Sequence, residues 1–172
     1  HQLHRRQRQM CIRDRFYPDY KSVEGDHQKK MSDYWHTELD DKKGLTVVEI
    51  INAAYEGDLK GLYIMGENPA MSDPDQNHAR AALANLDFLV VQDIFPTETT
   101  AYADVILPAS AWPEKDGTVT NTDRKVQIGR KAVPMPGDAR QDWWIIKEIG
   151  LRMGLNWNYD SPKDIFNEMK DV

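Results

Sequence analysis

The sequence has few of the residues that build covalent or metal-bound frameworks. It contains one cysteine, Cys11, which excludes an internal disulfide and a cysteine-based metal site within these 172 residues. The five histidines have no metal-ligand spacing, and no apolar run approaches the roughly 18 residues of a membrane-spanning helix. We therefore expect a soluble protein of a reducing compartment, with no membrane segment and no metal ligands of its own.

A catalytic set is also lacking. The sequence has no Ser–His–Asp arrangement and no cluster of metal ligands. Its one cysteine lies within residues 1–15, so the folded part has no Cys–His pair. Acidic pairs such as Asp40-Asp41 are most simply solvated surface charge. The residues by themselves predict a ligand-binding domain without reaction machinery.

Charge is distributed unevenly along the chain. Residues 1–15 hold five arginines and one aspartate, so the remaining residues carry −10 within an overall charge of −6. A basic arm can bind nucleic acid, but this stretch has no apolar periodicity and does not begin with methionine. We interpret it as foreign or disordered sequence outside the fold. The acidic remainder argues against nucleic acid as a partner.

The rest of the chain divides at residue 45. Residues 16–44 are polar and weakly patterned, which predicts an irregular connecting segment with one short helix around residues 29–39. Residues 45–172 are predicted to form most of one α/β domain, in which helices alternate with short, continuously apolar strands.

Local signals fix the elements of this domain. Thr46 and Glu49 form a capping box that begins a helix, and Gly57 ends it. Strands are predicted at residues 61–65, 87–91 and 105–107, extended pieces at 117–121 and 125–128, and further helices from Ser72, over 138–154 and from Ser161. This order predicts a Rossmann-like parallel sheet with helices on both faces.

Polar residues follow the first two apolar strands, in Gly66-Glu67-Asn68-Pro69 and in Gln92-Asp93. Ligands of open parallel sheets bind beyond the carboxyl ends of the strands. Gly66 allows close approach to the backbone, and a helix beginning at Ser72 would offer N–H groups to a phosphate. A carboxylate such as Asp93 can accept two hydrogen bonds from the N–H edge of guanine. These features predict a nucleotide pocket.

The same residues also have purely structural explanations. They can form the hydrogen bonds of a turn, cap a helix or be charged side chains at a helix end or on the surface. The residues that can be explained in this way are Glu67, Asn68, Ser72, Asp93, Lys115 and Asp142. Taken alone, they leave a nucleotide loop and an ordinary turn as nearly equal alternatives.

Three stretches of the sequence resemble the molybdopterin oxidoreductases. They read GLTVVEIINAAYEGDLKGLYIMGENPAMSDPD, FLVVQDIFPTETTAYADVILPASAWPEKDGTVTNTDRKVQ and GDARQDWWIIKEIGLRMG. ADVILP recurs throughout that superfamily, whereas the combination of MGENPAMSDPD, TNTDR and ARQDWWII favours the alpha subunit of formate dehydrogenase. The resemblance extends over about two-thirds of the chain, from Gly44 to Gly154.

The resemblance implies a molybdenum or tungsten ion held by two molybdopterin guanine dinucleotides, one of them bound by this domain. Asn68 stands where some relatives carry an acid, so it is expected in the pocket without a role in reading the guanine. The implied cofactor-binding residues are Gly66, Glu67, Asn68, Ser72, Gln92, Asp93, Lys115 and Asp142.

The resemblance also implies that the chain is an internal fragment of a larger subunit. The metal-ligating cysteine or selenocysteine, its histidine and arginine neighbours and the iron–sulfur cysteines would precede residue 16, and a barrel-like domain would follow residue 172. In that parent, which we expect in the cytoplasm rather than the periplasm, formate would be oxidised to carbon dioxide. Electrons would pass through iron–sulfur clusters to a partner subunit with iron–sulfur or flavin groups.

Two alternative parents remain. A nitrate reductase or another molybdopterin oxidoreductase would share this domain, because the substrate is selected by residues near the metal. The non-catalytic large iron–sulfur subunit of a respiratory NADH dehydrogenase would keep the fold without the pterin. The intact Gly66-Glu67-Asn68, Gln92-Asp93 and Lys115 argue against that second parent.

Overall fold

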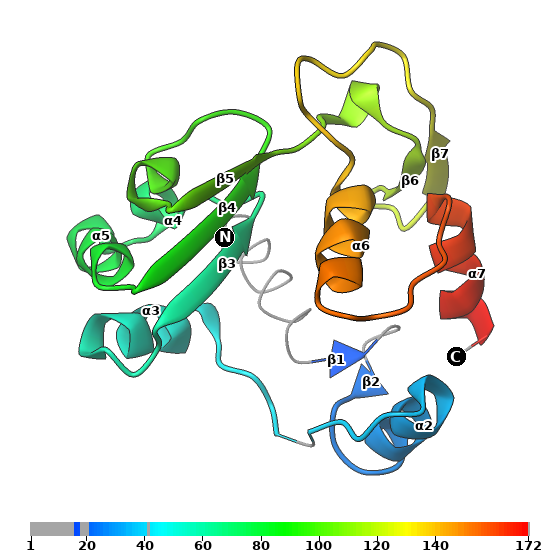
Figure 1. The fold of residues 1–172 in the computed structure, drawn as a ribbon, viewed down its shortest axis with the longest axis horizontal. Coiled ribbons are helices and arrows are strands. Elements are labelled where there is room, and N and C mark those ends of the chain that lie inside the picture. The colour runs from blue at the N-terminus through cyan, green and yellow to red at the C-terminus, as the bar shows by residue number, and fades with distance from the viewer. Residues whose placement is uncertain (1–15, 18–20, 41, 172) are drawn as a thin grey trace.

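The computed structural model describes residues 16–17, 21–40 and 42–171 (Figure 1). The prediction that residues 1–15 form a foreign or disordered arm lies outside the described residues. Among the described residues, no helix is both long enough and apolar enough to cross a membrane.

A three-stranded parallel sheet forms the centre of the domain. Its strands are β3 (Gly61–Met65), β4 (Phe88–Asp93) and β5 (Val105–Pro108), in the order β3-β4-β5. All three predicted strands are confirmed, as is their parallel arrangement. Because the strands run the same way, their carboxyl ends lie at one edge of the sheet, where the predicted nucleotide loops begin.

Helices α3 (Val47–Glu56) and α5 (Gln76–Ala84) lie on one side of this sheet, and α6 (Asp142–Arg152) lies on the other (Figure 1). The predicted capping box of α3 is present, with both of its hydrogen bonds formed between Thr46 and Glu49. Apolar residues from β3, β4 and α5 pack together and make the main core. The buried members of this core are Ile64, Ala70, Leu83, Leu89 and Val91.

The opposite face of the sheet is less completely covered. Side chains alternate between the two faces of a strand, so Tyr63 and Phe88 point away from the core of α5. They are 40% and 51% exposed. Helices therefore flank both faces of the sheet, as predicted, but α6 reaches the second face mainly near the carboxyl ends of the strands.

The prediction that a helix begins at Ser72 is wrong. A short helix, α4 (Pro69–Ser72), ends at Ser72, and the next helix, α5, is capped by Asp75, whose Oδ1 accepts from His78 N at 3.1 Å. Asp73 precedes a proline, which disfavours helical backbone, and it is extended with φ −68° and ψ 137°. Pro74 thus separates the two helices.

The helix predicted over residues 138–154 is shorter at its start, since α6 begins at Asp142. Arg140 instead forms a parallel bridge with Ala109, and its carbonyl accepts from Ser110 N at 2.9 Å. This pairing continues the line of β5 and keeps the backbone before α6 extended. It also brings the start of α6 to the carboxyl edge of the sheet.

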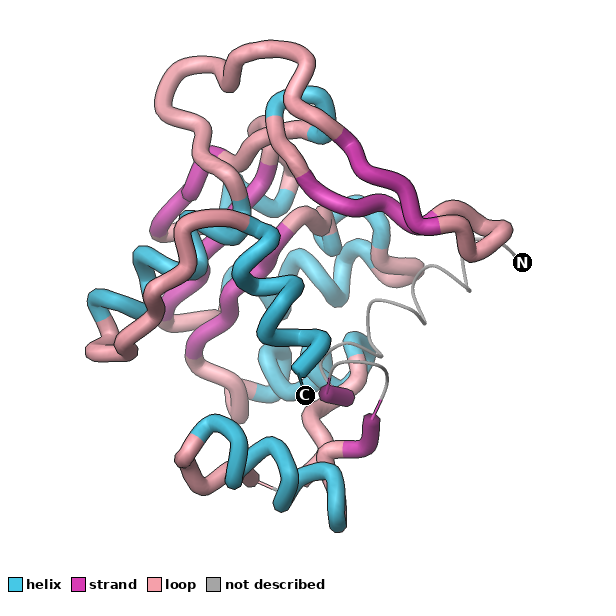
Figure 2. Tube along the Cα trace, turned by 90° about the vertical axis from the view of Figure 1, so that its right-hand side faces the viewer, coloured by secondary structure: helices cyan, strands magenta, loops and turns pink. Residues whose placement is uncertain are grey.

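The remaining elements surround this unit. The two predicted extended pieces form an antiparallel hairpin, which Figure 2 shows extending away from the parallel sheet. The short helix predicted near residues 29–39 is present slightly earlier, as α2. The bounds are β1 (Phe16–Tyr17), β2 (Lys21–Ser22), α2 (Asp26–Trp35), η2 (Thr99–Tyr102), η3 (Trp112–Glu114), β6 (Gly117–Thr120), β7 (Val126–Gly129) and α7 (Pro162–Asp171).

Candidate functional site

Backbone hydrogen bonds tie together the segments that leave the three parallel strands. Gly66 N donates to Gln92 O at 2.8 Å, and Ala109 N, directly after β5, donates to Asp93 O at 2.9 Å. Gly66 has a φ of +65°, which L side chains rarely adopt, and a Cβ added there would meet nothing within 4 Å. The backbone after β3 is therefore open to a ligand at this position.

Two carboxylates lie at the ends of neighbouring strands. Burial, together with the nearby negative charge of Asp93, raises the pKa of Glu67, although the backbone N–H of Asn68 lowers it. Asp93 Oδ1 accepts from Ile94 N at 2.7 Å, so one carboxylate oxygen is held by the backbone of the next residue. Two neighbouring carboxylates favour a ligand that presents hydrogen-bond donors.

Asn68 is held by the segment that follows β4. Its Oδ1 accepts from Thr99 N at 3.1 Å and from Thr99 Oγ1 at 2.7 Å, and its Nδ2 donates to Glu98 Oε2 at 2.6 Å. The same Thr99 hydroxyl accepts from Ala70 N at 3.1 Å. The amide oxygen of Asn68 is thus committed to the protein, which supports the structural explanation for this residue.

A chain of side-chain contacts joins three of the predicted residues. Gln92 is fully buried, its Nε2 donates to Asp142 Oδ1 at 2.8 Å, and its Oε1 accepts from the Tyr63 hydroxyl. Asp142 Oδ2 pairs with Lys115 Nζ, which also donates to Ser110 O at 3.0 Å. The side chains of Lys115 and Asp142 remain 25% and 31% exposed. The two charged groups are partly accessible, whereas Gln92 is fully buried.

Ser72 lies apart from these contacts, at the last position of α4. It is exposed, and its N–H donates to Asn68 O at 2.8 Å. Because no helix begins there, the N–H groups expected for a phosphate are not at Ser72. A cofactor contact by Ser72 stays a prediction that depends on the resemblance.

Residues 9–152 match the family model described as molybdopterin oxidoreductase. The chain belongs to this family. The alpha subunit of the F420-dependent formate dehydrogenase of Methanocaldococcus jannaschii is 52% identical over 158 residues, which cover 91% of the chain and 23% of that protein. The assimilatory nitrate reductase catalytic subunit of Bacillus subtilis is 39% identical over 160 residues, covering 90% of the chain and 22% of the relative.

The fold of this molybdopterin oxidoreductase domain is also found in a solved structure. Acetylene hydratase from Pelobacter acetylenicus superposes with a TM-score of 0.61 at 20% identity, over 84% of the chain and 22% of that enzyme. At this identity the likeness concerns the fold. The chain spans less than a quarter of each of these relatives.

Three residues that contribute to these contacts were not predicted from the sequence. Ser110 is fully buried, and its Oγ has no hydrogen-bond partner within the described part of the chain. It follows the third apolar strand just as Gln92 and Asp93 end the second, so the same rule would have found it. No sequence pattern marks Thr99 or Tyr63 as part of the site, because their roles depend on contacts between distant segments.

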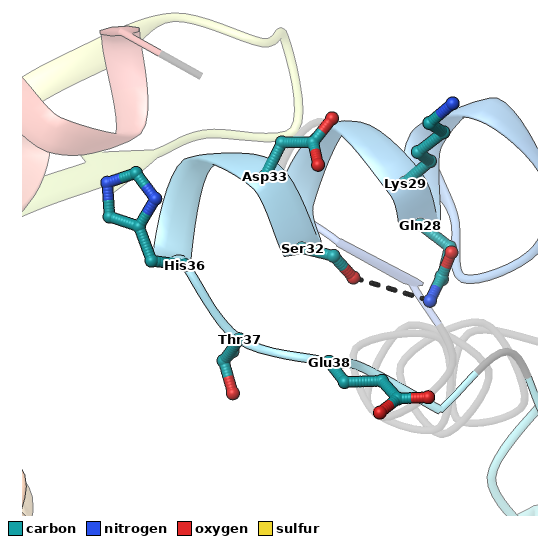
Figure 3. Close-up of a pocket in the computed structure, with 7 residues that line it drawn as sticks. All are labelled: Gln28, Lys29, Ser32, Asp33, His36, Thr37 and Glu38. Carbon is teal, nitrogen blue, oxygen red and sulfur yellow. Dashed lines mark hydrogen bonds between the residues drawn. The ribbon is translucent and has the colours of Figure 1, made fainter.

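Two hollows in the structure lie away from the strand ends. One is formed by α2 and the residues after it, and Figure 3 shows Gln28 and Ser32 pointing toward each other there, joined by a hydrogen bond of 3.3 Å. The other, which we call the aromatic groove, lies between α2, α6 and α7. It is lined by Tyr34, Trp35, Trp143, Trp157, Tyr159 and Glu168, among others. Neither hollow contains any of the eight predicted cofactor-binding residues.

Contacts in the aromatic groove make the free energy of unfolding dependent on pH in the alkaline range. Burial and the hydrogen bond to Glu168 raise the pKa of Tyr159 to about 12. An unfolded tyrosine loses its proton near pH ~10, so the unfolded state binds fewer protons between these two values. We expect the free energy of unfolding to fall as the pH rises from about 10 to about 12.

This dependence is measured by urea unfolding across that pH range. The Y159F variant, which has no ionisable phenol, is expected to show a shallower decline than the parent chain. Y55F, which removes a hydroxyl from an exposed tyrosine of α3, serves as the control. Equal slopes for Y159F and the parent chain would contradict the assignment.

Proposed function

We propose that this chain binds the guanine end of a molybdopterin guanine dinucleotide, one of two that hold molybdenum or tungsten in a formate dehydrogenase alpha subunit. The observation that carries the proposal is the placement of Glu67 and Asp93 beside the open backbone of Gly66, at the ends of β3 and β4.

The residues present fit such a ligand. Guanine presents an N–H and an amino group on one edge, and a carboxylate such as Asp93 can accept from both. Lys115 supplies a cation for a phosphate, and its partner Asp142 can accept from a ribose hydroxyl. The buried Oγ of Ser110 has no hydrogen-bond partner among the described residues and lies beside the Lys115 contact, which supports a ligand with a polar group at this edge.

The chain's own residues would bind and orient the nucleotide. The bound cofactor would supply the two-electron oxidation of formate to carbon dioxide and a proton. Iron–sulfur clusters elsewhere in the parent would carry the electrons to a partner subunit with iron–sulfur or flavin groups. Identities of 52% and 46% to proteins of Methanocaldococcus jannaschii and Methanococcus maripaludis that are named as F420-dependent formate dehydrogenase alpha subunits support this parent.

A nitrate reductase is the second candidate, because a relative with that name is 39% identical over nearly the same part of the chain. The two are separated by assaying the purified parent for formate-dependent reduction of a viologen dye and for nitrate reduction. We expect the first activity alone. Nitrate reduction alone would assign the second candidate, and a parent without molybdenum, tungsten or guanine nucleotide would favour a non-catalytic iron–sulfur subunit.

The binding proposal is tested on the chain itself by calorimetric titration with GDP and with ADP. The two ligands share the ribose and the diphosphate, but adenine lacks the donor edge that a carboxylate would read. We expect GDP to bind at least about tenfold more tightly, the equivalent of one strong hydrogen bond to a charged group. Equal affinities, or no binding of either ligand, would contradict the proposal.

A further inference from the structure

We infer that Tyr63 is a positioning residue of this pocket, acting through the buried Gln92 on Asp142 and Lys115. The inference rests on the proposed function, since it concerns how the protein holds two groups that would meet the nucleotide. Tyr63 itself lies on β3, and Gln92 on the neighbouring β4 separates it from Asp142 at the start of α6, so Tyr63 would not touch the ligand.

The chemistry of the groups fixes the direction of each hydrogen bond. An ionised Asp142 accepts hydrogen bonds and cannot donate them. The amide nitrogen of Gln92 must therefore face Asp142, at 2.8 Å from Oδ1, and the amide oxygen must face Tyr63. It follows that the Tyr63 hydroxyl donates its proton to Gln92 Oε1.

Because Gln92 is buried, losing its hydrogen bond to Tyr63 has an energetic cost. Gln92 is fully buried, so water does not substitute for a lost partner, and an unpaired buried amide oxygen is costly. Burial, followed by the charge of Asp142, raises the pKa of Tyr63, which keeps the phenol protonated and able to donate. Without the hydroxyl, the Gln92 amide has one fixed partner fewer and can turn away from Asp142.

The effect would reach the ligand through the accessible pair. Asp142 Oδ2 binds Lys115 Nζ while Oδ1 is held by Gln92, so the carboxylate is fixed at both oxygens. Releasing one of them lets the carboxylate rotate and draws Lys115 with it. A neutral hydrogen bond of this kind changes affinity by about 3- to 10-fold.

Tyr63 offers a clean substitution, because its ring is 40% exposed and Y63F removes a single oxygen without opening a core cavity. We expect Y63F to bind GDP about 3- to 10-fold more weakly than the parent chain. The matched control is Y55F, which removes the same atom from an exposed tyrosine on α3 and should leave GDP affinity unchanged.

A double-mutant cycle with D142A, which removes the oxygen that accepts from Gln92, separates positioning from a general loss of structure. If Tyr63 acts through Asp142, Y63F should weaken GDP binding in the parent chain and have almost no further effect in the D142A background. Equal losses in both backgrounds would overturn the inference, as would an unchanged affinity of Y63F. Failure of the parent chain to bind GDP would instead overturn the proposed function, and the inference with it.

A second readout needs no ligand. The side-chain amide resonances of Gln92 in a nitrogen-15 spectrum report its hydrogen bonds directly. We expect them to shift in Y63F and to remain in place in Y55F, with the backbone spectrum of both variants otherwise preserved. Unchanged Gln92 resonances in Y63F would contradict the contact on which the inference depends.

Discussion

Replacing Asp93 by asparagine is expected to weaken GDP binding about 10- to 100-fold, the range of a hydrogen bond to a charged group. Asparagine keeps an oxygen that can accept from Ile94 N, as Asp93 Oδ1 does at 2.7 Å, so the turn should survive. What is lost is the charge and the second acceptor. An amide N–H2 in that place would face the donor edge of guanine.

Calorimetric titration of D93N with GDP measures this loss. D87N is the matched control, because Asp87 is an exposed aspartate just before the opposite end of the same strand. It removes the same charge about one strand length away, and its GDP affinity should stay close to that of the parent chain. If D93N and D87N bound GDP equally well, Asp93 would have no part in reading the ligand.

The largest expected effect on stability comes from the middle of the sheet. Leu89 is the second residue of β4, the central strand of the sheet, is 1% exposed, and packs with Ile64, Leu83 and Val91. Truncating a fully buried leucine to alanine removes its transfer free energy and leaves a cavity. We expect L89A to lower the free energy of unfolding by about 2–5 kcal/mol, measured by urea denaturation.

L45A provides the comparison for this measurement. Leu45 is 46% exposed and precedes the first helix of the α/β unit, so its truncation should change the free energy of unfolding by about 0.5 kcal/mol or less. A similar loss in both variants would mean that β4 is not the centre of the packed core.

The local parts of the fold were predictable because short-range signals determine them. The capping box of Thr46 and Glu49 begins α3 as expected, and the continuous apolar runs became parallel strands. The start of α5 was mispredicted because Ser72 and Asp75 have the spacing of a capping box, whereas Pro74 forces the preceding residue out of helical backbone.

The contacts within the candidate site depend on residues far apart in the sequence, which the sequence alone does not pair. Asn68 bonds Thr99 across 31 positions, and Gln92 bonds Asp142 across 50. Sequence reasoning placed Gln92 at a strand end but could not tell that its side chain would be buried. The general location of the site follows from the carboxyl ends of the strands. Which of its side chains are buried and which stay accessible to a ligand depends on packing between distant segments.

The boundaries of the chain's segments stay predictions. The family match begins at residue 9, within the stretch interpreted as foreign or disordered, and extends to residue 152. It spans the end of that stretch, the connecting segment and most of the α/β unit.

The most direct test of the nucleotide pocket is a nitrogen-15 NMR titration of the chain with GDP. The proposed site predicts chemical-shift changes concentrated at Gly66, Glu67, Asp93, Lys115 and Asp142, at the carboxyl ends of β3 and β4 and the start of α6. The aromatic groove should remain unaffected. Changes confined to that groove, or no changes at saturating GDP, would contradict the account.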